Sequence, residues 1–283
     1  MSLPAAAFAV AVVVGGSNYV AVRYSNRELD PLWGAGLRFA LAAIAFGLIC
    51  AAFRLALPRG RALALAVLYG LLGFAAAYGC LYWAMQEVPA GIAAVVLAVG
   101  PLLTLLLAVA HGLERLRVRA LVAALVAIAG SVLIFFQPGS VSFGLASLAL
   151  LLLAALAASE SVVLTKSIGP LDPFAVNFVA MSAGALTLIA TAALAGEELA
   201  LPEAGKTRVA VVYLGLATVV LFLCILHLIQ HWPASSAAYT FVSMPVVAVA
   251  LGALVAGEEV TATTVLGGLV VCGAVYLGAV RRT

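Results

Sequence analysis

Four hydroxyl side chains recur at helical spacing between Pro233 and Pro245. Residues three and four apart share one face of a helix, so these groups form a polar face that leads to Pro245. Such a face could exchange hydrogen bonds with a small polar ligand, and we expect it to line a cavity. The alternative is that the hydroxyls bond back to their own helix or hold neighbouring helices together. The four residues are Ser236, Tyr239, Thr240 and Ser243.

Tyr78 and Tyr82 form a second candidate surface, because they are four residues apart on another apolar segment. Aromatic rings there could stack a ligand side chain, while the hydroxyls bind a carboxylate or ammonium group. Packing between helices is the alternative, and it is the interpretation that we adopt for the neighbouring Trp83. We expect the two tyrosines to line the cavity.

His227 and His231 are also four residues apart, a spacing that can hold a metal ion, but the sequence shows no third ligand nearby. We therefore expect no metal site. His227 is expected either to line the cavity and exchange protons or to pack with a hydrogen-bonded partner. No HExxH, GxSxG or paired CxxC occurs, and Gly205-Lys206-Thr207 lacks the first glycine of a phosphate-binding loop. The sequence predicts neither an enzyme nor a cofactor.

Composition excludes a water-soluble fold. Hydrophobic residues make up 66% of the 283 residues and charged residues 9%, whereas soluble domains carry roughly 25% charged residues. Long, continuously apolar runs are typical of membrane-spanning helices rather than of a β-barrel. The net charge of +3 gives no electrostatic footprint for nucleic acid. The chain is predicted to be an all-α integral membrane protein.

Charge, proline and glycine clusters divide the chain into ten apolar segments with short connections. A helix that crosses the bilayer needs about 20 residues, and each segment is near that length. The predicted helices are residues 4–22, 31–53, 62–86, 89–110, 119–137, 143–165, 173–195, 207–230, 233–256 and 261–280.

Two halves of the chain share one pattern. Pro89 and Pro101 repeat at Pro233 and Pro245, an offset of 144, and Glu114 follows its proline at the same distance as Glu258. We expect two five-helix repeats, residues 1–138 and 139–283, which together make one transport domain. An odd number of crossings inverts the second copy, as in many secondary transporters.

Basic residues predict the orientation, because Lys and Arg accumulate on the cytoplasmic side. We expect both termini to be cytoplasmic, because that orientation places nine basic residues inside and four outside. The nine are Arg54, Arg59, Arg61, Arg115, Arg117, Arg119, Lys166, Arg281 and Arg282.

Two prolines and two charged residues lie well inside predicted helices, away from their ends. Pro101 and Pro245 should each kink a helix, because proline removes one backbone hydrogen bond and clashes with the carbonyl four residues back. Each kink is either a hinge beside the pathway or a static feature of packing. Glu160, whose repeat counterpart is Asn18, is expected to accept a coupling proton or an ammonium group, or else to reach the interface. Arg38 is expected to snorkel or to pair with an outer acidic residue.

The opening Gly15-Gly16-Ser17-Asn18-Tyr19-Val20-Ala21-Val22-Arg23, the Asp30-Pro31 and Arg38-Phe39 pairs, and the repeated proline frame resemble the EamA-type branch of the drug/metabolite transporter superfamily. Within it the chain is similar to bacterial exporters of aromatic and other neutral amino acids, the YddG type. The resemblance implies a central cavity between the halves and no nucleotide. We also expect Asn18 to line the cavity and bind substrate.

We therefore expect a secondary transporter in the inner membrane of a bacterium. It would export small metabolites, by resemblance neutral or aromatic amino acids, by alternating access through the central cavity. One alternative is a broad exporter of cationic drugs, with Glu160 as the attractive group. The other is a non-transporting membrane enzyme or scaffold. The expected partners are the small-molecule substrate and the lipid bilayer, and the sequence carries no signal for an oligomeric state.

Overall fold

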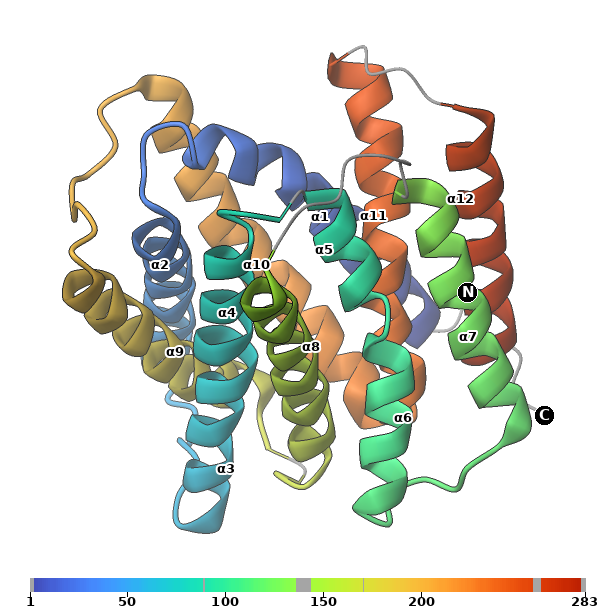
Figure 1. Ribbon diagram of the computed structural model, residues 1–283. Helices are drawn as coiled ribbons and strands as arrows, with labels where there is room; N and C mark the ends of the chain where they lie inside the picture. The colour runs from blue at the N-terminus through green and yellow to red at the C-terminus, as the bar shows by residue number, and fades with distance from the viewer. Residues whose placement is uncertain (1–2, 89, 136–143, 170, 257–260, 281–283) are drawn as a thin grey trace.

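The computed structural model describes residues 3–88, 90–135, 144–169, 171–256 and 261–280, and these residues form helices without strands (Figure 1). The elements are α1 (Leu3–Ser25), α2 (Pro31–Ala52), α3 (Arg61–Gly70), the π-helical segment η1 (Leu71–Ala76), α4 (Ala77–Ala84), α5 (Ala90–Leu97), α6 (Gly100–Ala110), α7 (Val118–Phe135), α8 (Leu145–Lys166), α9 (Pro173–Ala195), α10 (Gly205–His231), α11 (Ala234–Ala256), α12 (Ala262–Val275) and the π-helical segment η2 (Tyr276–Val280).

Ten helical units result across the described residues, because α3, η1 and α4 run on without a break, α5 and α6 form one interrupted unit, and η2 continues α12. The predicted number of helices is therefore confirmed. Eight units are long and apolar enough to cross a membrane, and the two others contain the shorter apolar stretches Leu3–Asn18 and Val118–Ile134. The π-helical segment inside the third unit was not predicted. Such segments often occur at functional sites.

The packing pairs helices that occupy the same place in the two halves of the chain. α2 packs along α9, and α7 packs along α12, at opposite sides of the molecule (Figure 1). α1 contacts α10 and α11, while α8 contacts the η1–α4 segment and α6. Aromatic rings fill the region between these pairs, with Phe74 at 4.9 Å from Phe39 and 4.8 Å from Phe222 between ring centroids. The cavity described below lies beside this aromatic cluster.

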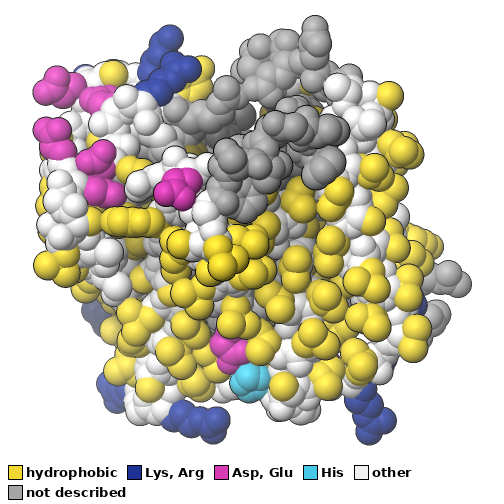
Figure 2. All heavy atoms as spheres, in the orientation of Figure 1, with side chains coloured by type: hydrophobic (Ala, Val, Ile, Leu, Met, Phe, Trp, Pro, Cys, Tyr) yellow, Lys and Arg dark blue, Asp and Glu magenta, His cyan; other side chains and the backbone are white. Residues whose placement is uncertain are grey.

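Charge separates the two ends of the molecule. Figure 2 shows most acidic side chains of this face at one end and most Lys and Arg side chains toward the other. The basic end includes the connections after α2 and α6, which contain Arg54, Arg59, Arg115 and Arg117, and the last residue of α8, Lys166. This asymmetry agrees with the distribution from which the orientation was predicted.

Acidic side chains at the other end join the α1–α2 connection to the α9–α10 connection. Glu197 accepts hydrogen bonds from the backbone N–H groups of Leu32 and Trp33, at 3.2 and 2.8 Å. Asp30 accepts one from the N–H of Glu198 at 2.8 Å. A carboxylate at a helix N-terminus satisfies orphan N–H groups and complements the helix dipole. The start of α2 is thus fixed by a residue from the second half.

Glu28 makes a further link between these two connections. Its carboxylate accepts hydrogen bonds from the N–H groups of Glu203 and Ala204, directly before α10. A hydrogen bond from the Thr207 side chain, followed by that from Glu203, lowers the pKa of Glu28 below its ordinary value of 4.5. This carboxylate therefore stays ionised in mildly acidic solution.

Glu114, one of the residues that marked the repeat, has a structural role at the opposite end. Its carboxylate accepts hydrogen bonds from the N–H of Ser235 at 3.0 Å and from the Ser235 hydroxyl at 2.5 Å. It therefore caps α11, a helix of the other half. Its predicted repeat partner, Glu258, lies outside the described residues, as does Pro89.

Candidate substrate cavity

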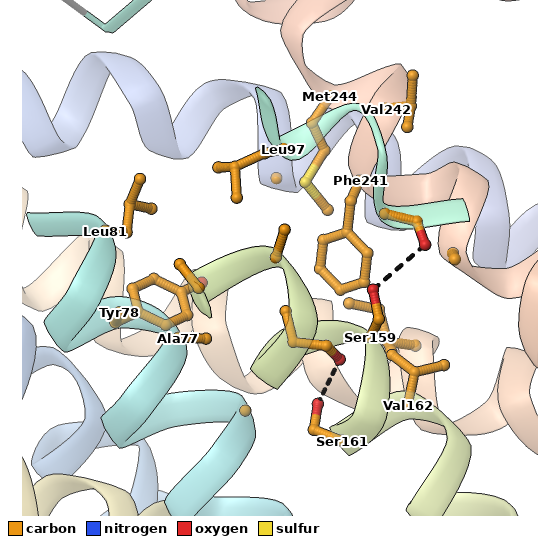
Figure 3. Close-up of a pocket in the computed structure, with 18 of the residues that line it drawn as sticks. Ala77, Tyr78, Leu81, Leu97, Ser159, Ser161, Val162, Phe241, Val242 and Met244 are labelled. Atoms are coloured by element: carbon orange, nitrogen blue, oxygen red, sulfur yellow. Dashed lines mark hydrogen bonds between the residues drawn. The ribbon is translucent and has the colours of Figure 1, made fainter. Parts of the chain in front are cut away.

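A cavity of about 230 Å³ lies between helices of both halves (Figure 3). Its wall comes from α1, α2, the third unit, α5, α6, α7, α8, α10 and α11, and most of it is apolar. Figure 3 shows Tyr78, Leu97, Phe241 and Met244 around the same space. A small, largely apolar cavity with a few polar groups is the usual form of a small-molecule site.

Much of the wall consists of residues that correspond in the two halves. Between residues 77–100 and 221–244, eight pairs of lining residues are separated by 144 positions, the offset of the proline frame. The pairs are Ala77 and Leu221, Tyr78 and Phe222, Leu81 and Ile225, Met85 and Ile229, Ala94 and Ala238, Leu97 and Phe241, Ala98 and Val242, and Gly100 and Met244. Both halves thus contribute equivalent helix faces to one cavity.

The polar part of the wall is less symmetric than its shape. The first half supplies most of the polar side chains, and the second half supplies two serines from α8. Those two hydroxyls already donate to carbonyl groups, Ser159 to Gly100 at 3.2 Å and Ser161 to Ala158 at 2.7 Å. The polar lining residues of the first half are Asn18, Arg38, Tyr69, Tyr78, Tyr82, Thr104 and Ser131.

Tyr78, Tyr82 and Asn18 all line this cavity. The two tyrosine rings lie 6.2 Å apart between centroids, and the Tyr82 side chain is buried. Asn18 is 5% exposed, and neither its Oδ1 nor its Nδ2 atom has a hydrogen-bond partner among the described residues. A buried amide without partners is costly, so a ligand that supplies them would bind favourably.

The hydroxyl face of α11 lies elsewhere. Ser236 donates to the carbonyl of Gly278 at 3.0 Å, and Ser243 donates to the carbonyl of Tyr239 at 2.8 Å. Tyr239 packs against Gly278, and Thr240 is fully buried. The hydroxyl groups of Tyr239 and Thr240 have no hydrogen-bond partner in the described chain. None of the four residues is part of the cavity wall; α11 contributes an apolar face there instead, with the lining residues Ala238, Phe241, Val242, Met244 and Pro245.

Arg38 is a lining residue that sequence reasoning did not select. It is 4% exposed, and its Nε–H donates to the Thr218 hydroxyl at 2.7 Å. Thr218 lies at the middle of α10 and is fully buried. Arg38 therefore points into the membrane interior rather than toward outer acids, which corrects the expected snorkelling or outer ion pair. In the sequence, the feature that could have marked Arg38 as a site residue was its position as a charged residue within an apolar helix.

The two prolines act differently on their helices. α5 ends at Leu97, whose carbonyl would clash with the Pro101 ring, and α6 begins at Gly100. Pro245 lies inside the continuous helix α11 and lines the cavity. Gly15 and Gly16 of α1 face this part of α11, and a Cβ atom on Gly16 would lie 2.8 Å from the Met244 carbonyl oxygen. The two glycines permit α1 to approach α11 closely.

Glu160 lies outside the cavity wall, beside the end of α6. Its Oε1 is 3.2 Å from Nε2 of His111, and its Oε2 is buried without a hydrogen-bond partner among the described residues. His111 Nδ1 lies 2.9 Å from the Leu107 carbonyl, which can only accept, so Nδ1 carries a hydrogen. A hydrogen bond between Nε2 and Glu160 then needs one further proton: a protonated imidazole donates to the carboxylate, or a protonated carboxyl group donates to Nε2. The pair is thus a site that can hold a proton.

His227 also lies outside the cavity wall. Its ring stacks on that of His231, with 4.1 Å between centroids, and its Nε2 is buried without a partner in the described chain. The described residues contain no group of three His, Cys, Asp or Glu side chains that could hold a metal ion.

Comparison with known proteins decides the family. The profile of the EamA-like transporter family matches residues 3–136 and again residues 144–279. This chain belongs to that family. It is therefore a membrane transporter with many helices rather than a representative of an enzyme family, and the two matched regions correspond to the two halves that share the cavity.

Individual relatives agree. The chain is 32% identical over 257 residues to the "Uncharacterized inner membrane transporter YedA" of Escherichia coli strain K12, covering 88% of this chain and 81% of the relative. YedA of E. coli O157:H7 gives the same values. A solved crystal structure has a similar fold, with a TM-score of 0.84 at 17% identity, covering 98% of this chain and 96% of the other. With its apolar helices, the chain is a multi-pass inner-membrane protein.

Proposed function

We propose that this protein exports small neutral metabolites, foremost neutral and aromatic amino acids, by alternating access through the cavity between its halves. The observation that carries the proposal is the cavity itself, to which both halves of the chain contribute many residues in pairs 144 positions apart. In transporters built from repeats, substrate sites lie near the midplane at the interface of the repeats.

The size and chemistry of the cavity support a small amphipathic substrate. Its volume of about 230 Å³ is below the ~300–1,000 Å³ of sites for drug-sized ligands. The rings of Tyr78, Phe222 and Phe241 offer an aromatic surface, and the unpartnered amide of Asn18 offers a polar contact. An aromatic or branched amino acid combines both properties.

A cationic drug fits this cavity less well. The carboxyl group expected to attract it, that of Glu160, bonds to His111 and lies outside the cavity wall, whereas the buried Arg38 lies in the wall. An arginine keeps its positive charge in proteins and repels a cationic ligand in a medium of low dielectric constant.

We further propose that residues 1–138 and 139–283 form inverted five-helix repeats, with both termini in the cytoplasm. The pairing of α2 with α9 and of α7 with α12 supports the repeat, and the basic connections after α2 and α6 support the orientation. Pro101 and Pro245 lie at the two equivalent helices that meet the cavity, where a change of kink angle would open or close the wall.

Counterflow into proteoliposomes tests the function. Vesicles loaded with unlabelled phenylalanine should accumulate labelled phenylalanine, threonine should compete, and a cationic dye should not. Protein-free liposomes give the background. Uptake of the dye without uptake of amino acids would replace the proposed substrate class, and the absence of flux for every solute would refute transport by this cavity.

A further inference from the structure

Arg38 is a buried cation in the wall of the cavity. It is the eighth residue of α2, which begins at Pro31. At ~1.5 Å per residue it lies roughly 10 Å below the end of the helix. Its hydrogen bond to Thr218, at the middle of α10, holds the guanidinium deeper still. Charged side chains inside a bilayer are costly and mark functional sites.

No carboxylate of the described residues forms an ion pair with Arg38. The acids at the same end of the molecule have other partners: Asp30 accepts from Glu198, and Glu197 accepts from Leu32 and Trp33. The protein thus leaves the charge of Arg38 without a counter-ion in this part of the chain. A buried charge without a partner is unfavourable until an anion supplies one.

Neighbouring rings stabilise the guanidinium only in part. Its Cζ lies 5.3 Å from the centroid of Phe39 and 5.5 Å from that of Tyr78, within the range of cation–π attraction. The Tyr82 hydroxyl is also near Arg38. Arginine has five N–H donors: Nε–H donates to Thr218, and the Tyr82 hydroxyl lies close enough to accept from one further donor. The remaining Nη donors are available to a molecule in the cavity.

Asn18 is an independent second observation in the same wall. Both of its amide atoms lack partners among the described residues, and the side chain is 5% exposed. The cavity therefore contains both a cation without an anion and an amide without partners, which are the groups that recognise a polar, negatively charged end of a ligand.

We propose that Arg38 binds a carboxylate group of the substrate through its Nη donors, with Asn18 as a second polar partner of the same molecule. The inference rests on the proposed function in that it takes this cavity as the substrate site. Arginine matches a carboxylate with two parallel hydrogen bonds. One unpaired cation balances one negative charge, which favours a carboxylate over a phosphate monoester that carries about −1.5 to −2.

Ligand binding to the purified wild-type protein tests the charge requirement without a mutation. The first series is L-phenylalanine, 3-phenylpropionate, L-phenylalaninamide and phenyl phosphate, and the second is L-leucine with its amide. Calorimetry or ligand-induced thermal stabilisation should rank each acid at least about tenfold tighter than its amide, because charge-assisted hydrogen bonds are roughly twice as strong as neutral ones. Three outcomes overturn the proposal: the acid and its amide bind equally, phenyl phosphate binds more tightly than the carboxylates, or no ligand of either series binds.

Substitutions then assign the requirement to Arg38. Arg38→Gln should remove the preference for the acid over the amide, and Arg38→Lys should retain part of it. Arg119→Gln is the matched control, because Arg119 donates to the Leu277 carbonyl away from the cavity and should keep the full preference. An unchanged preference in Arg38→Gln overturns the proposal, and if that variant does not fold, the wild-type series decides alone.

The same series separates this inference from the proposed function. If phenylpropionate binds and is transported while phenylalanine and leucine are not, amino-acid export is wrong but carboxylate binding by Arg38 stands. If amino acids are transported and their amides equally well, export stands and the role of Arg38 falls.

Discussion

At the scale of single side chains, hydroxyl groups of similar chemistry differ in whether they can bind a ligand, because their surroundings differ. Tyr82 is buried in the wall beside Arg38, whereas the Ser243 hydroxyl donates to the Tyr239 carbonyl in its own helix. A hydroxyl that already donates within its helix has little left to offer a ligand.

This difference predicts different transport kinetics. Tyr82→Phe should raise the apparent KM for the substrate by about fivefold, the value of one hydrogen bond of ~1 kcal/mol. Tyr82→Ala should raise it further, because the ring is lost as well. Ser243→Ala is the control and should leave the KM unchanged, as measured by counterflow at equal amounts of folded protein. A raised KM in Ser243→Ala alone would instead favour the hydroxyl face of α11 as the substrate surface.

The proton-holding pair of Glu160 and His111 gives a second prediction at this scale. If transport is coupled to protons at this pair, Glu160→Gln should remove the response of flux to a pH gradient while leaving exchange at equal pH intact. The reason is that the amide of glutamine cannot take up and release a proton, whereas the carboxyl group 3.2 Å from Nε2 can. His231→Gln, at a stacked histidine on α10, is the control. A wild-type pH response in Glu160→Gln would exclude the pair as the coupling site.

At the scale of helices, close contact between α1 and α11 depends on glycine. A Cβ on Gly16 would lie 2.6 Å from Val247 Cβ and 2.8 Å from the Met244 carbonyl, and that backbone cannot move aside cheaply. Gly16→Ala should therefore cost about 1–3 kcal/mol, as overpacking does. Gly273→Ala is matched, because that position in α12 has open space around it, and there alanine should stabilise the helix by ~0.5–1 kcal/mol. Thermal unfolding in detergent would measure both, and equal midpoints would contradict the packing argument.

Glu28 predicts a dependence of stability on pH for the link between the two acidic connections. Because its folded-state pKa is lowered below 4.5, its contribution is fully present above about pH 4.5 and is lost as the pH falls through the folded-state value. Glu28→Gln should thus lower the unfolding midpoint at pH 7, and the difference from wild type should shrink below pH 4.5. A difference that stays constant down to pH 3 would show that charge on Glu28 does not stabilise the link.

At the scale of the whole molecule, the sequence predicts the helices better than it predicts their faces. Ten apolar segments, the proline frame and the end of α5 at Leu97 follow from local rules of length, charge and proline geometry. Helical spacing puts the four hydroxyl residues of α11 on one side of that helix, but periodicity does not say which neighbour covers that side. The Ser236 bond to Gly278 shows that η2 covers it.

Arg38 illustrates the same limit. Its expected outer partners, such as Asp30, bond instead to backbone N–H groups of a connection about 170 residues away, while Thr218 supplies an acceptor in mid-membrane from another helix. Local sequence patterns do not reveal contacts between residues that are so far apart in the chain. The cavity pairs at an offset of 144, by contrast, were implicit in the proline frame, because equivalent faces of a repeat meet at its interface.

Orientation in the membrane is a prediction for the whole chain. The 196–204 connection contacts the start of α2 through Glu198 and Asp30, whereas residues 53–60 follow the end of that helix, so the two connections lie at opposite ends. In a variant without its four native cysteines, Ala200→Cys should react with a membrane-impermeant maleimide in intact spheroplasts, and Gly60→Cys only after permeabilisation. The physical reason is that Arg54, Arg59 and Arg61 are close to the second site in the sequence and basic residues stay cytoplasmic. The reverse labelling pattern would show that the 196–204 connection is cytoplasmic and residues 53–60 are outside, which contradicts the proposed orientation.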